Sequence, residues 1–422
     1  MIETVKNAWK IPELRKKLTF VLFAIVIFRL GFAIYVPFVD TKSLALQFST
    51  LNNGNLLGYF NTLSGGGFAT ASIFAMSIYP YINSSIIIQL LQVAIPALER
   101  LAKEGGEEGK KKIQTIIRVT TLVLAAVMAF GYYITLKTYG VLTRTDAWSG
   151  IVIIMTMIAG SMFVMWLGDQ ITEKGIGNGI SMILLVGIVS QGMHAVTTVF
   201  SLSWWAILII LAICLGIIAF IVFITEAERR IPVQYAKRVV GRKQYGGQST
   251  HLPMKVNMSG VMPVIFASTI CGVPATIVGF TQPAQGTFWY NLANDWFAPG
   301  APAYIIIYVL LIFAFAYFYS TIQFNPIEVA NNMKKNGGFI PGFRPGKPTS
   351  DFIAKVLNKI TMMGAIFLAI IAALPLILSN IPSLGALGIG GTTTLIMVSV
   401  SLETVRAIEG EMMMRHYKGF LE

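Results

Sequence analysis

The chain contains few charged residues: Asp, Glu, Lys and Arg make up 12% of its 422 residues, whereas 55% are hydrophobic. A soluble globular domain carries about 25% charged residues, so this composition excludes an ordinary soluble protein. The two cysteines, Cys214 and Cys271, fall in apolar runs, which gives no support for a disulfide framework or a metal cluster. The composition therefore predicts a polytopic membrane protein in which the cysteines are small apolar packing residues.

The signatures of several enzyme classes are also missing. The chain has no HExxH motif and no GxxxxGK[ST] loop, and its three histidines share no helix face. The run Gly175-Ile176-Gly177-Asn178-Gly179 lacks the preceding strand and sixth-position glycine of a dinucleotide site. Asp169, near the end of an apolar run, has no second intramembrane aspartate for a protease dyad. We expect a protein that is not an enzyme and that uses no cofactor or metal.

Ten apolar runs are long enough to cross a bilayer, which takes about 20 helical residues. An even number of spans places both termini on the same side of the membrane. The predicted spans cover residues 18–39, 70–96, 114–136, 150–170, 178–200, 206–225, 258–280, 303–324, 358–379 and 389–409.

The basic residues are distributed unequally between the two sides. Of the residues between the spans, one side holds only Lys42, Lys137 and Arg144, although the chain carries 32 Lys and Arg. Cytoplasmic segments are enriched in Lys and Arg. We therefore predict that both termini of this multi-pass protein are cytoplasmic.

Ten spans divide into two halves of five, here residues 1–200 and 201–422. An odd number of spans per half makes the second half run inverted relative to the first, and such repeats commonly enclose a pathway. The segment Leu57–Pro96 fits this arrangement because it contains a glycine hinge at 65–67, Pro80 and several Ser, Asn and Gln residues. We interpret it as a broken helix that lines an internal space, and residues 259–277 as its weaker counterpart.

Two long cytoplasmic loops, residues 226–257 and 325–358, show no helical pattern. Loops of this length usually have a function or are disordered. In the second loop, glycines and prolines surround Arg344 and suggest a presented tip. Basic loops are also required by topology alone, so both interpretations remain open.

Residues deep inside the spans give little support for ion-coupled transport. Only Arg29 and Arg118 carry charge there, without matching midplane acids. Ile78 and Ile82 lie one helical turn apart, as in an apolar constriction, but ordinary core packing explains this spacing better when it is considered alone.

Five segments resemble the SecY family, the central subunits of the bacterial Sec protein-conducting channel, or translocon. They are SGGGFATASIFAMSIYPYINSSIIIQLLQ, ITEKGIGNGIS, QYAKRVVGRKQYGGQSTHLPMKVNMSGVMPVIFAS, FNPIEVANNMKKNGGFIPGFRPGKPT and GGTTTLIMV, and they occur in register along nearly the whole chain. The resemblance implies an all-α fold of ten transmembrane helices in two inverted halves, with a short re-entrant plug half-helix at about 56–70.

The resemblance also implies the residues that form each part of the channel. The pore ring corresponds to Ile78, Ile82, Ile180, Leu184, Ile265 and Ile396, and the plug to Phe60, Asn61, Leu63, Ser64, Gly65, Gly66 and Gly67. Gln89 and Asn257 would contribute to a lateral gate, and Lys237, Arg238, Arg242, Lys243 and Arg344 to docking. Ile180 fits poorly by hydropathy, because it follows Lys174 by only six residues.

The function implied by the resemblance is translocation of unfolded polypeptides, with sideways release of hydrophobic segments into lipid. The implied partners are SecE, SecG, the SecA motor, the ribosome and a preprotein with its signal sequence. The alternative is an inverted-repeat small-solute transporter. A transporter would show a midplane cluster of polar ligands, whereas a channel for chains would show an aliphatic ring with a plug beneath it.

Overall fold

The structure is a computed structural model that describes most of the chain. Described are residues 2–50, 61, 64–200, 204–235, 238–240, 243–245, 249–281, 287–291, 296–297, 301–378 and 391–418.

Every predicted span overlaps a helix, which confirms the predicted helical class. The helices are α2 (Pro12–Gly31), α5 (Tyr79–Ala94), α7 (Gly106–Thr138), α8 (Ala147–Lys174), α9 (Gly179–Phe200), α10 (Trp204–Glu226), α11 (Met262–Thr281), α13 (Pro302–Gln323), α15 (Lys347–Leu378) and α17 (Gly391–Lys418). The described residues also form five shorter helices: α1 (Ile2–Lys10), α3 (Thr41–Thr50), α6 (Pro96–Lys103), α12 (Phe288–Asn291) and α14 (Pro326–Lys335).

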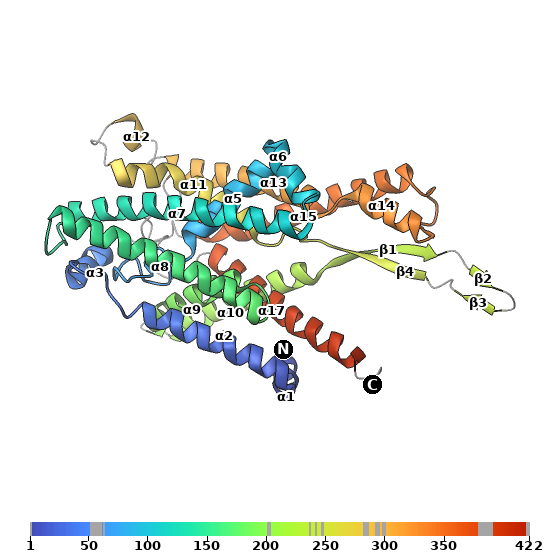
Figure 1. Cartoon of the computed structure of the whole chain (residues 1–422), viewed down its shortest axis with the longest axis horizontal. Helices are drawn as coiled ribbons and strands as arrows, with labels where there is room; N and C mark the ends of the chain where they lie inside the picture. The colour runs from blue at the N-terminus through green and yellow to red at the C-terminus, as the bar shows by residue number, and fades with distance from the viewer. Residues whose placement is uncertain are drawn as a thin grey trace.

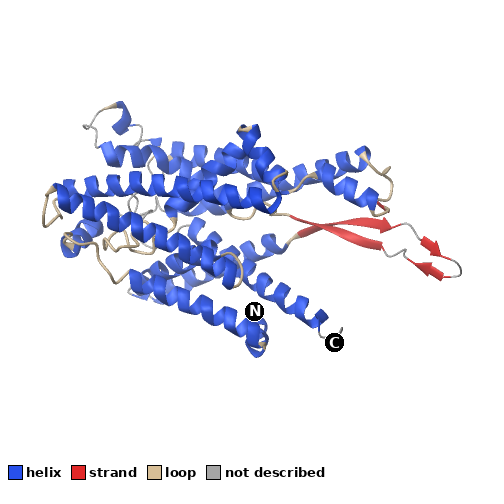
Figure 2. Ribbon diagram, viewed as in Figure 1, coloured by secondary structure: helices blue, strands red, loops and turns tan. Residues whose placement is uncertain are grey.

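Within the described residues, four helical segments are long and apolar enough to cross a membrane on their own. They are Gly106–Thr138, Ala147–Lys174, Pro302–Lys335 and Lys347–Leu374. The pair α5 and α6 passes the same test together but bends by 106°. Shorter apolar segments occur in α9, α10 and α11. The helices pack side by side as an elongated bundle with a strand ribbon extending from one end (Figures 1 and 2).

The second predicted span differs from expectation at its start. Residues 64–78 form turns, and the helix α5 begins only at Tyr79. Pro80 lies in the first turn of α5, where its missing N–H costs no helical hydrogen bond, so it starts the helix instead of breaking one. The expected counterpart, α11, runs continuously through Pro274. A transmembrane helix tolerates such a proline when neighbouring groups satisfy its backbone.

The two long loops, residues 226–257 and 325–358, have more regular structure than the sequence indicated. The first forms an antiparallel ribbon of β1 (Glu228–Tyr235) and β4 (Ser249–Lys255), tipped by β2 (Arg238–Val240) and β3 (Lys243–Tyr245). The second contributes α14 and β5 (Gly338–Phe339), and β5 pairs with β1. Ile231, Met254, Ile340 and Leu357 share one buried cluster, so the two loops and α15 form a single packed unit.

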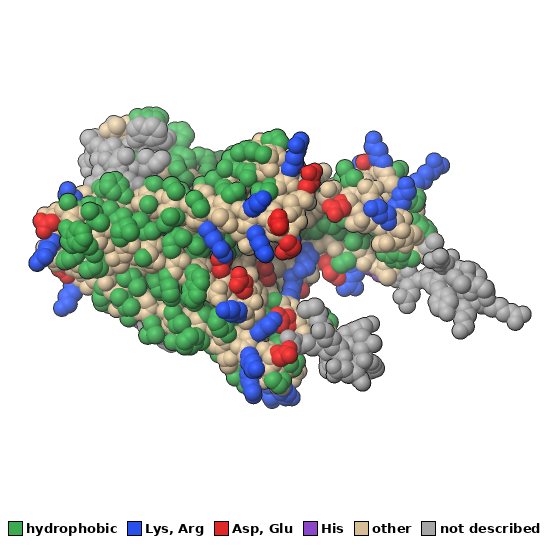
Figure 3. Space-filling model, in the orientation of Figure 1, with side chains coloured by type: hydrophobic (Ala, Val, Ile, Leu, Met, Phe, Trp, Pro, Cys, Tyr) green, Lys and Arg blue, Asp and Glu red, His purple; other side chains and the backbone are tan. Residues whose placement is uncertain are grey.

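The charged side chains gather at one end of the molecule. In Figure 3, hydrophobic side chains cover the helical body, and most Lys, Arg, Asp and Glu lie toward the end from which the strands extend. Both termini lie on that side in Figure 1.

The two halves contact each other on two sides of the bundle, and α9 also packs against α17. On one side α5 and α7 approach α11 and α13. On the other side α1 and α2 contact α17: the Thr4 hydroxyl donates to Glu409 at 3.1 Å, and Lys17 forms an ion pair with Glu411 at 2.6 Å. Ala8, Leu14 and Ile408 bury the apolar part of this second contact.

Candidate functional site

The six isoleucine and leucine residues of the expected ring fall in three connected apolar clusters. Ile78, Ile82, Ile180 and Leu184 belong to a cluster built from α2, α5, α8 and α9. Ile82 and Ile265 share the large cluster between α5, α11, α13 and α15. Ile265 and Ile396 share a third cluster with Ile188 of α9. Four helices and the residue before α5 thus bring these side chains into one continuous apolar region.

The position of Ile180 follows from how α8 and α9 connect. The helix α8 ends at Lys174, and the turn through Gly177, where φ is 74°, returns the chain directly onto α8. The Gly179 N–H donates to the Thr172 hydroxyl at 2.9 Å, so α9 begins alongside the last turns of α8. Ile180 therefore lies level with Gly168, about 9 Å back along α8 from Lys174 at 1.5 Å per residue.

The described end of the expected plug is docked between α7 and α9. Ser190 of α9 donates to the Gly65 carbonyl at 3.2 Å, and Tyr132 of α7 donates to the Phe68 carbonyl at 2.6 Å. The Asn61 side chain accepts from the Ala69 N–H at 2.9 Å and closes the turn.

Glycine is required at this docking point. Gly65 and Gly66 have φ of 71° and 90°, which L-residues adopt at a cost. A Cβ on Gly65 would also lie 3.0 Å from the Gly187 Cα. Of the predicted plug residues, Phe60 and Leu63 lie outside the described residues.

Gln89 makes a hydrogen bond between the two halves. Its side-chain oxygen accepts from the Tyr319 hydroxyl of α13 at 3.0 Å, and its amide donates to Ser85 at 3.2 Å. The Tyr319 ring packs edge-on against Phe266 of α11, with ring centroids 5.4 Å apart. Ile86 of α5 is buried in the same cluster as Phe266. Gln89, a predicted gate residue, thus has a hydrogen-bond partner, Tyr319, that the sequence did not indicate.

Asn257 lies between β4 and α11, beside α15. The residue is 6% exposed, and neither side-chain amide atom makes a hydrogen bond with the described residues. Gly364 of α15 allows the close approach, because a Cβ there would lie 2.6 Å from the Val256 carbonyl oxygen. Gln89 and Asn257 are therefore not paired with each other.

Arg344 lies at an exposed, pre-bent loop tip, as the glycine and proline pattern predicted. Gly342 and Gly346 have φ of 88° and 105°, and the Thr349 hydroxyl donates to the Arg344 carbonyl at 2.8 Å. Phe343 packs on Phe352 of α15 at 4.2 Å between centroids. Among the described residues, the Arg344 guanidinium makes no hydrogen bond or ion pair. Of the other predicted docking residues, Arg238 and Lys243 begin β2 and β3, whereas Lys237 and Arg242 lie outside the described residues.

The two intramembrane arginines have partners. Arg118 of α7 forms an ion pair with Asp169 of α8 at 2.7 Å, a pairing that the sequence analysis did not predict. Arg29 lies in the last turn of α2, not in mid-span, with its guanidinium carbon 5.1 Å from the Phe32 ring centre. A cation in the last turn of a helix is favoured by the helix dipole.

The sequence reasoning missed several residues of the apolar region. Ile183, Ile188 and Gly168 lie against ring positions but were not singled out. The helical period of α9 places Ile180, Leu184 and Ile188 on one face, so Ile188 could have been predicted from the sequence. No group of three or more His, Cys, Asp or Glu suited to a metal ion occurs in the described part of the chain.

The fold matches the folds of solved channel structures. The structure described as "The structure of a protein conducting channel" matches with a TM-score of 0.66 at 18% identity, covering 96% of each chain. One described as "Sec61 in the Canine ribosome-channel complex from the endoplasmic reticulum" matches with a TM-score of 0.62 at 18% identity over 96% of each chain.

The sequence comparisons identify the family. The SecY family model matches residues 72–405. The protein translocase subunit SecY of Streptomyces scabiei is 43% identical over the full length of both chains. That of Thermotoga maritima is 40% identical over 100% of this chain and 98% of its own. The chain belongs to the SecY family, as its five motifs indicated.

Proposed function

We propose that this chain is a protein-conducting channel that moves unfolded polypeptides across the membrane and releases hydrophobic segments sideways into lipid. The observation that carries the proposal is the continuous apolar region of Ile78, Ile82, Ile265 and Ile396, with the docked segment 64–70 against the adjacent face of α9. A constriction of branched apolar side chains opposes water and ions, and a movable segment reinforces it.

The chemistry of this region suits a polypeptide better than a small solute. A translocated chain presents every kind of side chain, so its pathway must fit it sterically without binding particular groups. The six ring positions are all aliphatic, and none carries a polar ligand. The alternative of a small-solute transporter would need a midplane cluster of polar ligands there.

Sideways release requires the wall to part between α5 and α7 on one side and α11 and α13 on the other. Ile86 lies buried against α11 and α13, and Gln89 bonds to Tyr319, so this wall is closed in the present structure. The closure is mostly apolar, with a single described hydrogen bond between Gln89 and Tyr319, and such an interface can open without breaking a large polar network.

The charged end of the molecule is the proposed cytoplasmic side, with both termini there. Arg344 and the ribbon of β1 and β4 form the proposed docking surface for the SecA motor and the ribosome. SecE and SecG are the proposed small membrane partners, and the bacterial cytoplasmic membrane is the proposed location. The chain itself acts as a channel without catalysis, and the partners supply the energy.

The test is photocrosslinking of a stalled nascent chain in vesicles. A photoreactive residue at Ile82, Ile265 or Ile396 should each capture the chain, whereas one at Val123, which is 58% exposed on α7, should capture lipid only. Equal capture at Val123, or no capture at the three ring positions, would overturn the proposed pathway.

A further inference from the structure

Gly168 of α8 supports one side of the apolar constriction. A Cβ added to this glycine would lie 3.3 Å from the Cδ1 atoms of both Ile78 and Ile183, and 3.5 Å from Cγ1 of Ile180. These isoleucines come from two elements, the residue before α5 and the first turns of α9. Two of them, Ile78 and Ile180, are proposed ring residues. At Gly168, where α8 has no side chain, Ile78 and Ile180 thus pack directly against the helix backbone.

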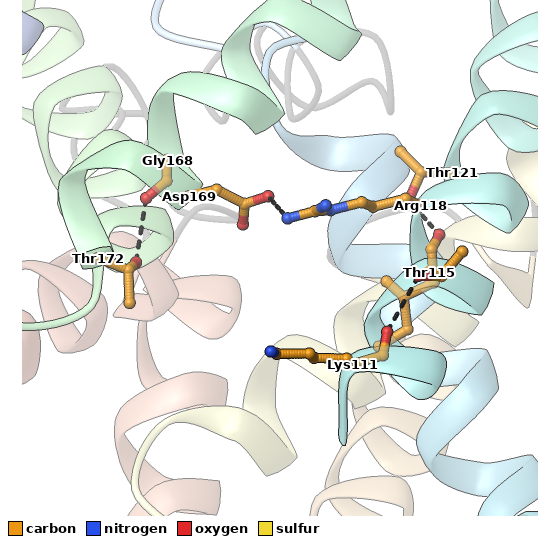
Figure 4. Close-up of polar contacts among 8 residues, drawn as sticks. Lys111, Thr115, Arg118, Thr121, Gly168, Asp169 and Thr172 are labelled. Carbon is orange, nitrogen blue, oxygen red and sulfur yellow. Dashed lines mark hydrogen bonds and ion pairs between the residues drawn. The ribbon is translucent and has the colours of Figure 1, made fainter. Parts of the chain in front are cut away.

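A hydrogen-bond chain ties the start of α9 to the same place. The Thr172 hydroxyl donates to the Gly168 carbonyl at 3.0 Å (Figure 4). The same hydroxyl accepts from the Gly179 N–H at 2.9 Å. Because Gly179 immediately precedes Ile180, any shift of α8 at this level is passed to a ring residue through a backbone contact.

The next residue of α8 faces a different neighbour. Asp169 accepts from the Arg118 guanidinium of α7 at 2.7 Å, and its side chain is 19% exposed (Figure 4). Successive residues of an α-helix point about 100° apart. Within one turn of α8, Gly168 therefore lies against the isoleucines of the ring, and Asp169 pairs with Arg118 of α7. A rotation of α8 about its axis that breaks the ion pair also moves Gly168 away from the isoleucines.

We propose that Gly168 and Asp169 are positioning residues of the pore seal. Gly168 provides the seat for Ile78 and Ile180, and the Arg118–Asp169 ion pair fixes the rotation of α8 that presents this seat. The inference rests on the proposed function, because it assumes that the isoleucines seal a pore. It adds two residues that contact no translocated chain and yet determine how tightly the ring closes.

The first test adds a methyl group at the seat. Gly168→Ala places a Cβ at 3.3 Å from two isoleucine methyl groups, so both must shift by a few tenths of an ångström. The resting ion conductance of the purified channel in planar bilayers should rise about fivefold, the change that about 1 kcal/mol produces in a two-state equilibrium. Gly216→Ala is the matched control. Gly216 lies in a different helix, α10, and a Cβ added there would meet nothing within 4 Å.

A second substitution tests the contact itself. Ile183→Val removes one of the two methyl groups that the new Cβ meets, and Ile183 is not a ring residue. The double variant Gly168→Ala/Ile183→Val should therefore leak less than Gly168→Ala alone. Conductance of the double variant equal to that of Gly168→Ala would mean that the leak does not arise at the seat.

The third test changes the ion pair without adding volume. Asp169→Asn should raise the resting conductance about threefold, because the Arg118 side chain is 46% exposed and an ion pair open to solvent contributes only about 0.2–1 kcal/mol. Asp169→Glu, which keeps the carboxylate, should stay near the parent value. If thermal stability falls in Asp169→Asn while conductance is unchanged, the pair only packs helices and the proposal is wrong.

These outcomes separate the inference from the proposed function. In one outcome, replacing Ile82 and Ile265 raises conductance while Gly168→Ala behaves like Gly216→Ala. That result would support the ring assignment and would contradict the positioning role of Gly168. If neither set of substitutions raises conductance, the assignment of the ring itself fails.

Discussion

Gln89 of α5 and Tyr319 of α13 share a hydrogen bond of 3.0 Å across the interface between the two halves of the chain. The two residues are 230 positions apart in the sequence. Around this bond, the interface consists of apolar side chains, including Ile86 and Phe266. Among the described residues, this interface therefore depends on packing and on one interhelical hydrogen bond, which removal of the Tyr319 hydroxyl oxygen would abolish.

The first prediction concerns that oxygen atom. Tyr319→Phe leaves the Gln89 carbonyl oxygen without its donor and keeps the ring against Phe266. Interhelical hydrogen bonds in membranes contribute about 0.6 kcal/mol, so the open fraction should rise about threefold. Export of a preprotein with a defective signal sequence measures this loss of stringency.

The matched control for this prediction is Tyr317→Phe. Tyr317 lies on the same helix, but its hydroxyl contacts the Asn358 carbonyl within the same half, at 3.5 Å. If Tyr317→Phe and Tyr319→Phe relax stringency equally, the bond to Gln89 has no special role.

The second prediction concerns Asn257, a proposed gate residue beside α11. Both amide atoms are buried without a described hydrogen bond, and burying an unsatisfied polar group costs about 1–3 kcal/mol. Asn257→Leu should remove that cost in the closed state and so tighten stringency without stopping assembly. Unchanged stringency at a normal protein level would show that Asn257 is a packing residue only.

The third prediction tests the ring. Ile82→Ser/Ile265→Ser removes two branched, partly buried side chains and should wet the constriction. Full burial of an isoleucine side chain contributes about 1.5–3 kcal/mol, so each of these loses less than that. Resting conductance in planar bilayers should rise by at least about an order of magnitude. The control is Ile87→Ser/Ile270→Ser on the same two helices, because these side chains are 40% and 37% exposed. A leak of the same size in the control would argue against a specific seal.

The fourth prediction concerns plug docking. Gly65→Ala adds a Cβ 3.0 Å from the Gly187 Cα at a φ of 71°, where a left-handed conformation costs an L-residue about 1–2 kcal/mol. The docked position should weaken, and a cysteine crosslink between the plug and α9 should form more slowly. Gly140→Ala has a similar φ of 66° with nothing within 4 Å, and it should leave the crosslinking rate unchanged.

The fifth prediction concerns the loop tip. Arg344→Glu should abolish ATP-driven import of a preprotein into vesicles, because charge reversal at a docking surface places a like charge against an acidic or phosphate-bearing partner. Arg344→Lys should show a partial loss, since an ammonium cannot replace the bidentate fork of a guanidinium. Lys335→Glu, an exposed residue of the neighbouring α14, controls for charge alone. Normal import by Arg344→Glu would mean that the charge of this loop serves orientation only.

The sequence alone determined the helices, the unequal distribution of basic residues and the pre-bent tip at Arg344. Each depends on local properties: runs of apolar residues, the count of cations between them, and glycines and prolines within a few positions. Ile78 and Ile82 could be proposed in the same way, because one helical turn separates them. The strand pairing of β1 with β4 and β5 was missed, since its stability comes from the buried cluster with α14 and α15.

Only the tertiary structure decided which distant residues meet. Ile180 reaches the depth of Gly168 because α9 starts alongside α8, a result of the turn at Gly177 and the contact of Gly179 with Thr172. The pairing of Gln89 with Tyr319, and of Arg118 with Asp169, joins helices whose order in the chain says nothing of their contacts. Hydropathy reports how apolar a segment is, whereas the partner of each polar side chain depends on the rotation and level at which its helix packs.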